Sequence, residues 1–173
     1  MNELVQWLAS TGLSNWIAGA GWVVPTVQCV HILAIGIIFG SVLMLDLRVL
    51  GWAGSDQTMT QATGRYSPWI WGALIVLAMS GGLLIFGEPG RELLSTSFWV
   101  KMAMLAIGSG FVVALQLSLK RHHETWDVDI GSQATTKILA FVTFFVWIAV
   151  IALGRLIAWD AQIWGALFPR SVS

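Results

Sequence analysis

The chain has 173 residues, of which 57% are hydrophobic and 10% are charged, and its nine basic and nine acidic side chains cancel. Soluble domains carry roughly 25% charged residues, so this composition excludes a water-soluble globule and a disordered chain. A net charge of zero without a basic patch argues against nucleic-acid binding. The single cysteine, Cys29, excludes an internal disulfide and a cysteine-cluster metal site.

The amino-terminal segment has an apolar face. Within residues 3–18, apolar side chains recur at roughly helical spacing, namely Leu4, Trp7, Leu8, Trp16 and Ile17. We predict an amphipathic helix that lies flat at the membrane interface, with both tryptophans at headgroup level. A short apolar cap packed on the rest of the molecule would have the same pattern.

Beyond this segment, the chain contains four long stretches without Asp, Glu, Lys or Arg, and about 20 apolar residues suffice to cross a bilayer. We interpret Ser67-Pro68 as a cap followed by Pro at the first helical position. The predicted fold is all-α, a single integral membrane domain with a four-transmembrane-helix bundle and the interfacial helix, and short connections make successive helices antiparallel. The predicted transmembrane helices cover about residues 22–50, 67–87, 97–121 and 136–160.

The distribution of Lys and Arg predicts the orientation in the membrane, because cytoplasmic loops are enriched in both. The first and third connections, with their flanking helix ends, hold Arg48, Arg65, Lys120, Arg121 and Lys137. The opposite side holds Arg91, Lys101, Arg155 and Arg170. We therefore expect a multi-pass protein in the lipid bilayer with both termini outside.

Small residues suggest close helix contacts. Gly36 and Gly40 form a GxxxG pattern in the first predicted helix, and small residues let helices approach closely in lipid. We interpret the pattern as packing within this bundle. A homodimer or contacts in a larger membrane complex are the alternative.

His31 is the clearest polar residue at membrane depth. It follows Trp22 by nine positions, which is about 13 Å along a helix, and its neighbours in the chain are apolar. Ionisable residues in a membrane span are costly and frequently functional. This imidazole can bind a metal, carry protons, or simply bond a backbone carbonyl.

Two cations are expected at the same outer level as His31. Lys101 lies about one turn into the third predicted helix, and Arg155 about one turn before the end of the fourth. Long side chains near helix ends can simply extend to the headgroups. Alternatively, two cations above an embedded histidine would suit a b-type haem, with His31 on the iron and the cations on the propionates.

The other end of the bundle and the soft donors offer further candidates. We expect an interfacial ion-pair network and a solvated helix end there, formed by Asp46, Arg48, Arg65, Gln116, His122 and His123.

Methionines and Cys29 suit copper(I), although Met in an apolar bundle usually fills space. Trp147 falls in the middle of a helix, where it either packs or contacts a flat cofactor.

Several segments resemble an uncharacterised group of bacterial four-helix membrane proteins. They are Trp22-Val-Val-Pro25, His31-Ile-Leu-Ala-Ile-Gly, Leu45-Asp46-Leu47-Arg48, Pro68-Trp69, Ser80-Gly81, Phe86-Gly87-Glu88-Pro89, Phe98-Trp99-Val100-Lys101 and Gly154-Arg155. That group is in turn similar to HemJ-type protoporphyrinogen oxidase and to the CopD copper-resistance membrane proteins.

This resemblance implies a protein of the bacterial inner membrane. HemJ-like proteins bind haem b and share a histidine and a lysine that look like His31 and Lys101. These relatives often carry a second histidine where Gln116 stands here. Our first hypothesis is a haem-b protein in electron transfer or porphyrin oxidation, with His31 as metal ligand and Lys101, Arg155 and Gln116 in the cofactor site. A copper carrier using His31 with methionines, and a cofactor-free accessory or anchor subunit, are the alternatives.

Overall fold

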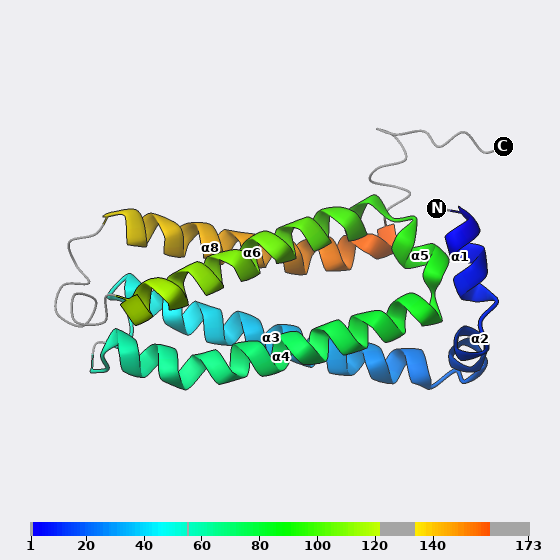
Figure 1. Cartoon of the computed structure of the whole chain (residues 1–173), viewed down its shortest axis with the longest axis horizontal. Helices are drawn as coiled ribbons and strands as arrows, with labels where there is room; N and C mark the ends of the chain where they lie inside the picture. Colours follow the sequence, from blue (N-terminus) through cyan, green and yellow to red (C-terminus); the bar gives the residue numbers. More distant parts are fainter. Residues whose placement is uncertain (1, 55, 122–133, 160–173) are drawn as a thin grey trace.

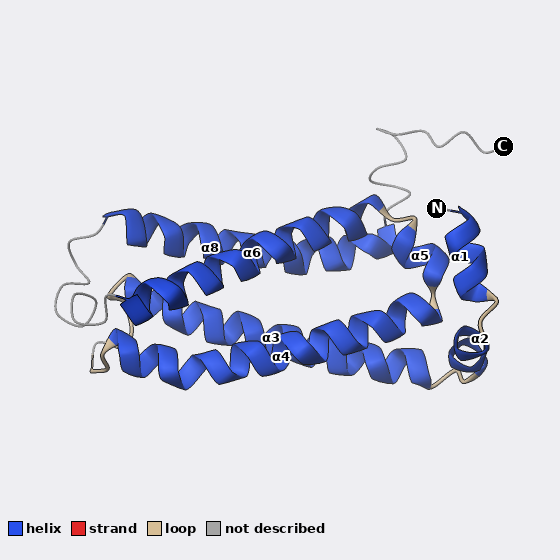
Figure 2. Cartoon of the chain, in the orientation of Figure 1, coloured by secondary structure: helices blue, strands red, loops and turns tan. Residues whose placement is uncertain are grey.

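The computed structural model describes residues 2–54, 56–121 and 134–159, and in this part of the chain helices are joined by short loops, without a strand (Figure 2). Two short helices come first, followed by four long ones and two short elements that accompany them. In chain order these are α1 (Asn2–Ala9), α2 (Gly12–Gly19), α3 (Val23–Val49), α4 (Met59–Gly87), α5 (Pro89–Leu93), α6 (Thr96–Arg121), α8 (Ala134–Leu156) and the 3-10 helix η1 (Ile157–Trp159).

The four long helices confirm the predicted membrane bundle. Each contains a stretch that is long and apolar enough to cross a membrane. The 27 residues of α3 extend about 40 Å at 1.5 Å per residue, which exceeds the roughly 30 Å hydrocarbon core of a bilayer. In Figure 1, α3 pairs with α4 and α6 with α8. The two pairs meet mainly through α3 and α8, and α4 contacts α6 only slightly.

The amino-terminal segment forms two helices instead of the single predicted one. The helix is interrupted at Ser10 and Thr11, whose hydroxyls donate to the backbone carbonyls of Trp7 (2.7 Å) and Leu8 (2.7 Å). Thr11 then caps α2 by accepting from the backbone N–H of Ser14 (3.3 Å). Such local side-chain bonds compete with helix continuation.

Both short helices and α5 lie at one end of the bundle (Figure 1). We call it the capped end, and the opposite end, where residues 50–58 join α3 to α4, the loop end. An apolar cluster of Leu8, Leu93, Phe98 and Ile157 attaches the cap to the bundle. Trp7 and Trp16 remain exposed, at 64% and 60%, so the segment packs on the bundle and still presents an aromatic face.

The predicted start of the second transmembrane helix was wrong. That helix, α4, begins at Met59 and not at Ser67-Pro68, and Pro68 lies inside it. A capping box at Thr58 starts the helix: the Thr58 hydroxyl accepts from the Gln61 backbone N–H (3.2 Å), and the side-chain amide oxygen Oε1 of Gln61 accepts from the Thr58 backbone N–H (3.0 Å). Pro68 only removes one backbone hydrogen bond, to the carbonyl of Gly64, and α4 continues through it.

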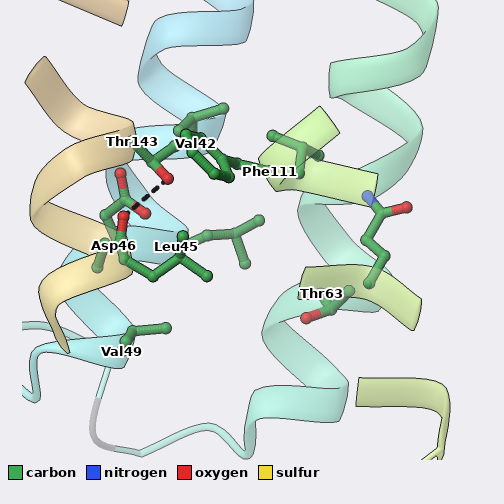
Figure 3. A pocket seen from close by; sticks show the side chains of 11 residues that line it. Val42, Leu45, Asp46, Val49, Thr63, Phe111 and Thr143 are labelled. Atoms are coloured by element: carbon green, nitrogen blue, oxygen red, sulfur yellow. Dashed lines mark hydrogen bonds between the residues drawn. The ribbon is translucent and has the colours of Figure 1, made fainter. Parts of the chain in front are cut away.

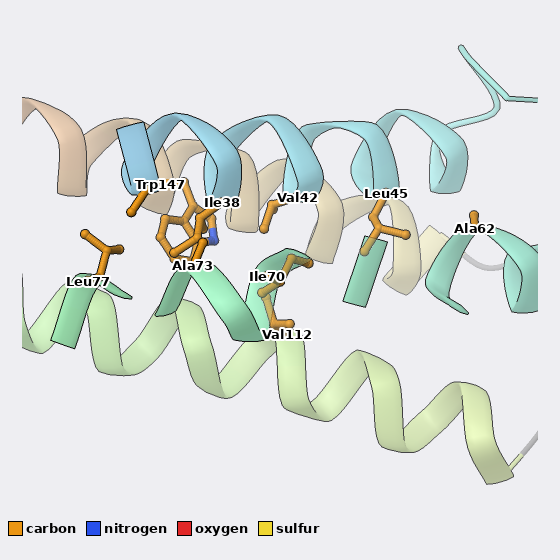
Figure 4. Packing of buried hydrophobic residues seen from close by; sticks show 10 residues of the cluster. Ile38, Val42, Leu45, Ala62, Ile70, Ala73, Leu77, Val112 and Trp147 are labelled. Carbon is orange, nitrogen blue, oxygen red and sulfur yellow. The ribbon is translucent and has the colours of Figure 1, made fainter. Parts of the chain in front are cut away.

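The main core runs along the middle of the bundle (Figure 4). Trp147 of α8 is 2% exposed and packs against the apolar side chains of the other long helices. Packing therefore explains the position of the ring, and its buried Nε1 has no hydrogen-bond partner. The cluster comprises Ala34, Ile38, Val42, Leu45, Ala62, Ile70, Ala73, Leu77, Val112 and Trp147.

The glycines fall into two groups. A Cβ added to Gly36 or Gly40 would meet no atom within 4 Å, so the interpretation of GxxxG as packing within this bundle was wrong. By contrast, a Cβ at Gly108 would lie 3.1 Å from Val146, and one at Gly87 would lie 3.1 Å from Ile17. The close contacts inside the bundle are therefore made at Gly87 and Gly108.

Candidate functional site

His31 lies in the half of the bundle nearer the capped end. It follows the first residue of α3 by eight positions, about 12 Å along the helix. Its ring nitrogen Nδ1 is 2.8 Å from the hydroxyl of Ser80 on α4. Gly81 lies beside the ring, because a Cβ added there would be 3.5 Å from His31 Cε1. The antiparallel pairing of α3 and α4 thus places the histidine against a Ser-Gly pair.

The hydrogen bonds around Ser80 assign the tautomer of His31. The Ser80 hydroxyl is 2.6 Å from the carbonyl oxygen of Val76, one turn earlier in α4. A hydroxyl has one proton, and this carbonyl takes it. Ser80 therefore accepts from Nδ1–H of His31, and the lone pair of Nε2 is left available. Metal-binding imidazoles generally donate their other ring N–H to a carboxylate, a backbone carbonyl or a water, and here the Ser80 hydroxyl takes that place.

Lys101 reaches the same region from α6. Its side chain is half-buried, with Nζ 5.2 Å above the centre of the Phe98 ring, which is within cation–π range. The stem runs beside Gly154 of α8, where a Cβ would be 3.8 Å from Lys101 Cδ. Lys101 lies close enough to His31 for its charge to act on the imidazole. The structure thus brings together these two predicted site residues.

An acidic residue that sequence reasoning did not select accompanies Lys101. Burial raises the pKa of the Glu92 carboxyl in α5, and attraction to Lys101 and Arg91 acts in the opposite direction. Arg91 itself forms a salt bridge with Glu88 (2.7 Å). The capped end therefore carries a mixed set of charges around Lys101, and not only cations.

Arg155 is exposed in the last turn of α8, one residue after Gly154. It lies at the same end of the bundle as Lys101, as predicted from its place in the chain. Among the described residues, no hydrogen bond or ion pair connects Arg155 to His31 or Lys101. A cofactor role for Arg155 stays a prediction.

Gln116 lies far from His31. Its amide oxygen accepts from Trp71 Nε1 (3.1 Å), and its amide nitrogen donates to the Ser67 hydroxyl (2.9 Å). Ser67 and Ser80, the α4 partners of Gln116 and His31, are 13 residues apart, roughly 20 Å along a helix. The structure therefore does not bring Gln116 to the ring of His31, and its two hydrogen bonds fasten α6 to α4.

The expected ion-pair network at the loop end is not formed by the described residues. Arg48 donates from Nε to the backbone carbonyl of Gln57 (2.7 Å) and stabilises the connection between α3 and α4. Arg65 lies over the ring of Tyr66. Asp46 is 4% exposed, and its Oδ2 has no hydrogen-bond partner. His122 and His123 lie outside the described residues.

The soft donors do not gather around His31. Cys29 is exposed, as are Met79 (67%) and Met102 (41%). In the part of the chain that the structure describes, no three His, Cys, Asp or Glu side chains are placed to hold a metal ion together. A metal at His31 would therefore need other ligands, such as those of a macrocycle.

Two functional candidates were missed from the sequence, Ser80 and Glu92. The signal for Ser80 was present, because a lone serine before Gly81-Gly82 interrupts the long apolar run from Ile70 to Phe86. Its partner was not readable, since the rotation of α4 relative to α3 decides which residue faces His31. Glu92 lies in a short connection that looks solvated in the sequence.

The chain belongs to DUF6644, a family of unknown function, whose sequence profile matches residues 5–160. No curated protein and no solved structure matches the chain. The resemblance to HemJ and CopD therefore rests on the sequence segments alone, from Trp22-Val-Val-Pro25 to Gly154-Arg155.

Proposed function

For this member of DUF6644, we propose a membrane protein that binds haem b in the half of the bundle nearer the capped end and works in electron transfer. His31 would hold the haem iron through Nε2. The single observation that carries the proposal is the hydrogen bond from His31 Nδ1 to Ser80, which is itself held by Val76 (2.8 and 2.6 Å). This arrangement leaves a neutral imidazole with a free nitrogen inside an apolar helix pair.

Two features near His31 support a flat, anionic macrocycle as the ligand. A Cβ added to Gly82 would meet nothing within 4 Å, and one at Gly81 would meet only His31. At Gly81 and Gly82, α4 therefore presents only backbone, and apart from the His31 ring no neighbouring side chain covers these two positions. Lys101 supplies a cation near enough to act on His31, and we assign it to a propionate. Haem b, when bound, supplies a one-electron iron couple whose potential depends on the ligand and its burial.

We also propose the bacterial inner membrane as the location, with both termini outside and the loop end in the cytoplasm. The excess of Lys and Arg in the first and third connections supports this orientation. Reporter fusions after residue 55 and after the carboxyl terminus test it. If a periplasmic reporter is active at the first site and inactive at the second, the protein has the opposite orientation.

The decisive experiment is an absorption spectrum of protein purified in detergent from haem-replete cells, before and after dithionite. We expect a Soret band and an alpha band that sharpens on reduction. His31→Ala abolishes both. His122→Ala, a change of another histidine, serves as the matched control and leaves them unchanged. A colourless wild type refutes the proposal, and metal analysis of the same sample then separates a copper carrier from a cofactor-free subunit.

The surrounding residues give graded tests of the same site. Ser80→Ala removes the group that orients His31, and loss of such an outer partner typically weakens binding by roughly 10- to 100-fold. Its matched control is Ser67→Ala, which lies on α4 near the loop end. Lys101→Met is expected to weaken haem retention, whereas Lys137→Met, on α8, leaves it unchanged. If both lysine changes weaken haem retention equally, Lys101 is not part of the haem site.

A further inference from the structure

A small internal cavity of about 20 Å³ lies between the long helices on the side of the core toward the loop end (Figure 3). Each long helix contributes a polar side chain to its wall. They are Asp46 from α3, Thr63 from α4, Gln116 from α6 and Thr143 from α8. The rest of the lining is apolar, so these polar side chains stand in a largely hydrocarbon wall.

Among the described residues of this wall, Asp46 is the only acidic side chain, and it is 4% exposed. Its Oδ2 has no hydrogen-bond partner, and neither has the hydroxyl of Thr63. Buried polar atoms are nearly always hydrogen-bonded. The unpartnered Asp46 oxygen on the cavity wall therefore indicates a small polar ligand beside it.

The other two polar residues can accept but have little left to donate. Thr143 donates its proton to the Leu139 carbonyl (2.9 Å), which is the dashed line in Figure 3. The amide of Gln116 already bonds Trp71 and Ser67. The donors that the described wall still offers to a carboxylate are the hydroxyl of Thr63 and the second N–H of the Gln116 amide.

No described cation compensates the charge of Asp46. The ionisable side chains nearest to it along α3, α4 and α8 are Arg48, Arg65 and Lys137, and none of them lines the cavity. Arg48 instead bonds the Gln57 carbonyl, and Arg65 lies over Tyr66. An ionised carboxylate without a partner in an apolar interior is strongly unfavourable, and such a group is neutralised by a proton.

We propose that Asp46 is a proton-binding site, with the proton held on the carboxyl and one water molecule in the cavity. A cavity needs roughly 10–15 Å³ to hold a water, and this one has about 20 Å³. The water accepts the proton of Asp46 and donates to Thr143, whose side chain lies next to that of Asp46 in Figure 3. Asp46 lies three residues before the end of α3, so about one helical turn separates it from the surface. The site is independent of the proposed haem.

Infrared spectroscopy of the purified full-length protein near neutral pH tests this assignment. We expect a carbonyl stretch of a protonated carboxylic acid that shifts down in D₂O. Asp46→Asn removes this band. Asp56→Asn, an exposed aspartate in the connection between α3 and α4, is the matched control and leaves it unchanged. Persistence of the full band in folded Asp46→Asn protein would overturn the proposal.

Two additional measurements distinguish a protonated Asp46 from a second protonated acid and from a bound sodium ion. Glu92→Gln identifies any contribution from the half-buried acid Glu92, and the band assigned to Asp46 survives it. Replacing choline with Na⁺ at constant ionic strength leaves the band intact; its disappearance would mean that the site holds sodium, which overturns the proton assignment. If Asp46→Asn does not fold, Asp46→Glu must move the band, and an unmoved band refutes the proposal.

Discussion

Replacing Gly108 with leucine should destabilise the bundle much more than the same change at Gly36. A Cβ at Gly108 would lie 3.1 Å from Val146 Cγ1 and 3.6 Å from Trp147 Nε1, whereas carbon atoms in favourable contact are about 3.5–4.0 Å apart. Even the first carbon therefore requires α6 and α8 to separate by several tenths of an ångström. Gly36 has nothing within 4 Å of an added Cβ.

The expected cost at Gly108 follows from overpacking. Extra carbons forced into a packed core cost about 1–3 kcal/mol, and the three carbons beyond Cβ enter a seam already closed by the buried Trp147. This corresponds to a change in the unfolding equilibrium constant of roughly 5- to 150-fold. At Gly36 the expected change is within about 0.5 kcal/mol, as for other surface substitutions.

Reversible unfolding in detergent, titrated with a denaturing detergent, measures both variants against the wild type. The same samples are run on a size-exclusion column with light scattering. If Gly36→Leu destabilises the protein as much as Gly108→Leu, the face of α3 that carries Gly36 is packed against a second chain. Equal stability of Gly108→Leu and wild type would refute the packing of α6 on α8.

Three further predictions concern individual contacts. Thr58→Ala removes the capping box of α4 and should cost about 1 kcal/mol, measured by the same unfolding assay, and a serine there should restore most of it. Gln116→Leu should lower stability through its lost bond to Trp71 and leave the Soret band of the His31 site in place; a lost band would place Gln116 in the cofactor site. Because the pKa of Glu92 is raised, the folded protein binds a proton at this carboxyl more readily than the unfolded protein does. The wild type should therefore be most stable relative to Glu92→Gln below the ordinary pKa of 4.5, and lose that advantage as the pH rises through the folded-state pKa. Melting curves of both proteins across this pH range check the sign, and a pH-independent difference would contradict it.

Some wrong predictions had a readable local cause. The Thr58 capping box was present in the sequence, but Ser67-Pro68 was given more weight as a start signal. The break at Thr11 also has a local cause, in hydroxyls that bond the preceding turn. In both cases short-range hydrogen bonding determined where a helix begins, and the polar residues at these two positions carried the signal.

By itself, the sequence determined the four apolar membrane helices, their order and the charged ends, because burial in lipid depends on the length and hydropathy of each segment alone. It also identified His31 and Lys101 as unusual residues at membrane depth. Only the tertiary structure decided that His31 faces Ser80, that Lys101 lies within electrostatic range of His31, and that Asp46 has no cation among the described residues. These contacts depend on the rotation of each helix about its axis, and that rotation is set by side-chain packing between helices that are distant in the chain.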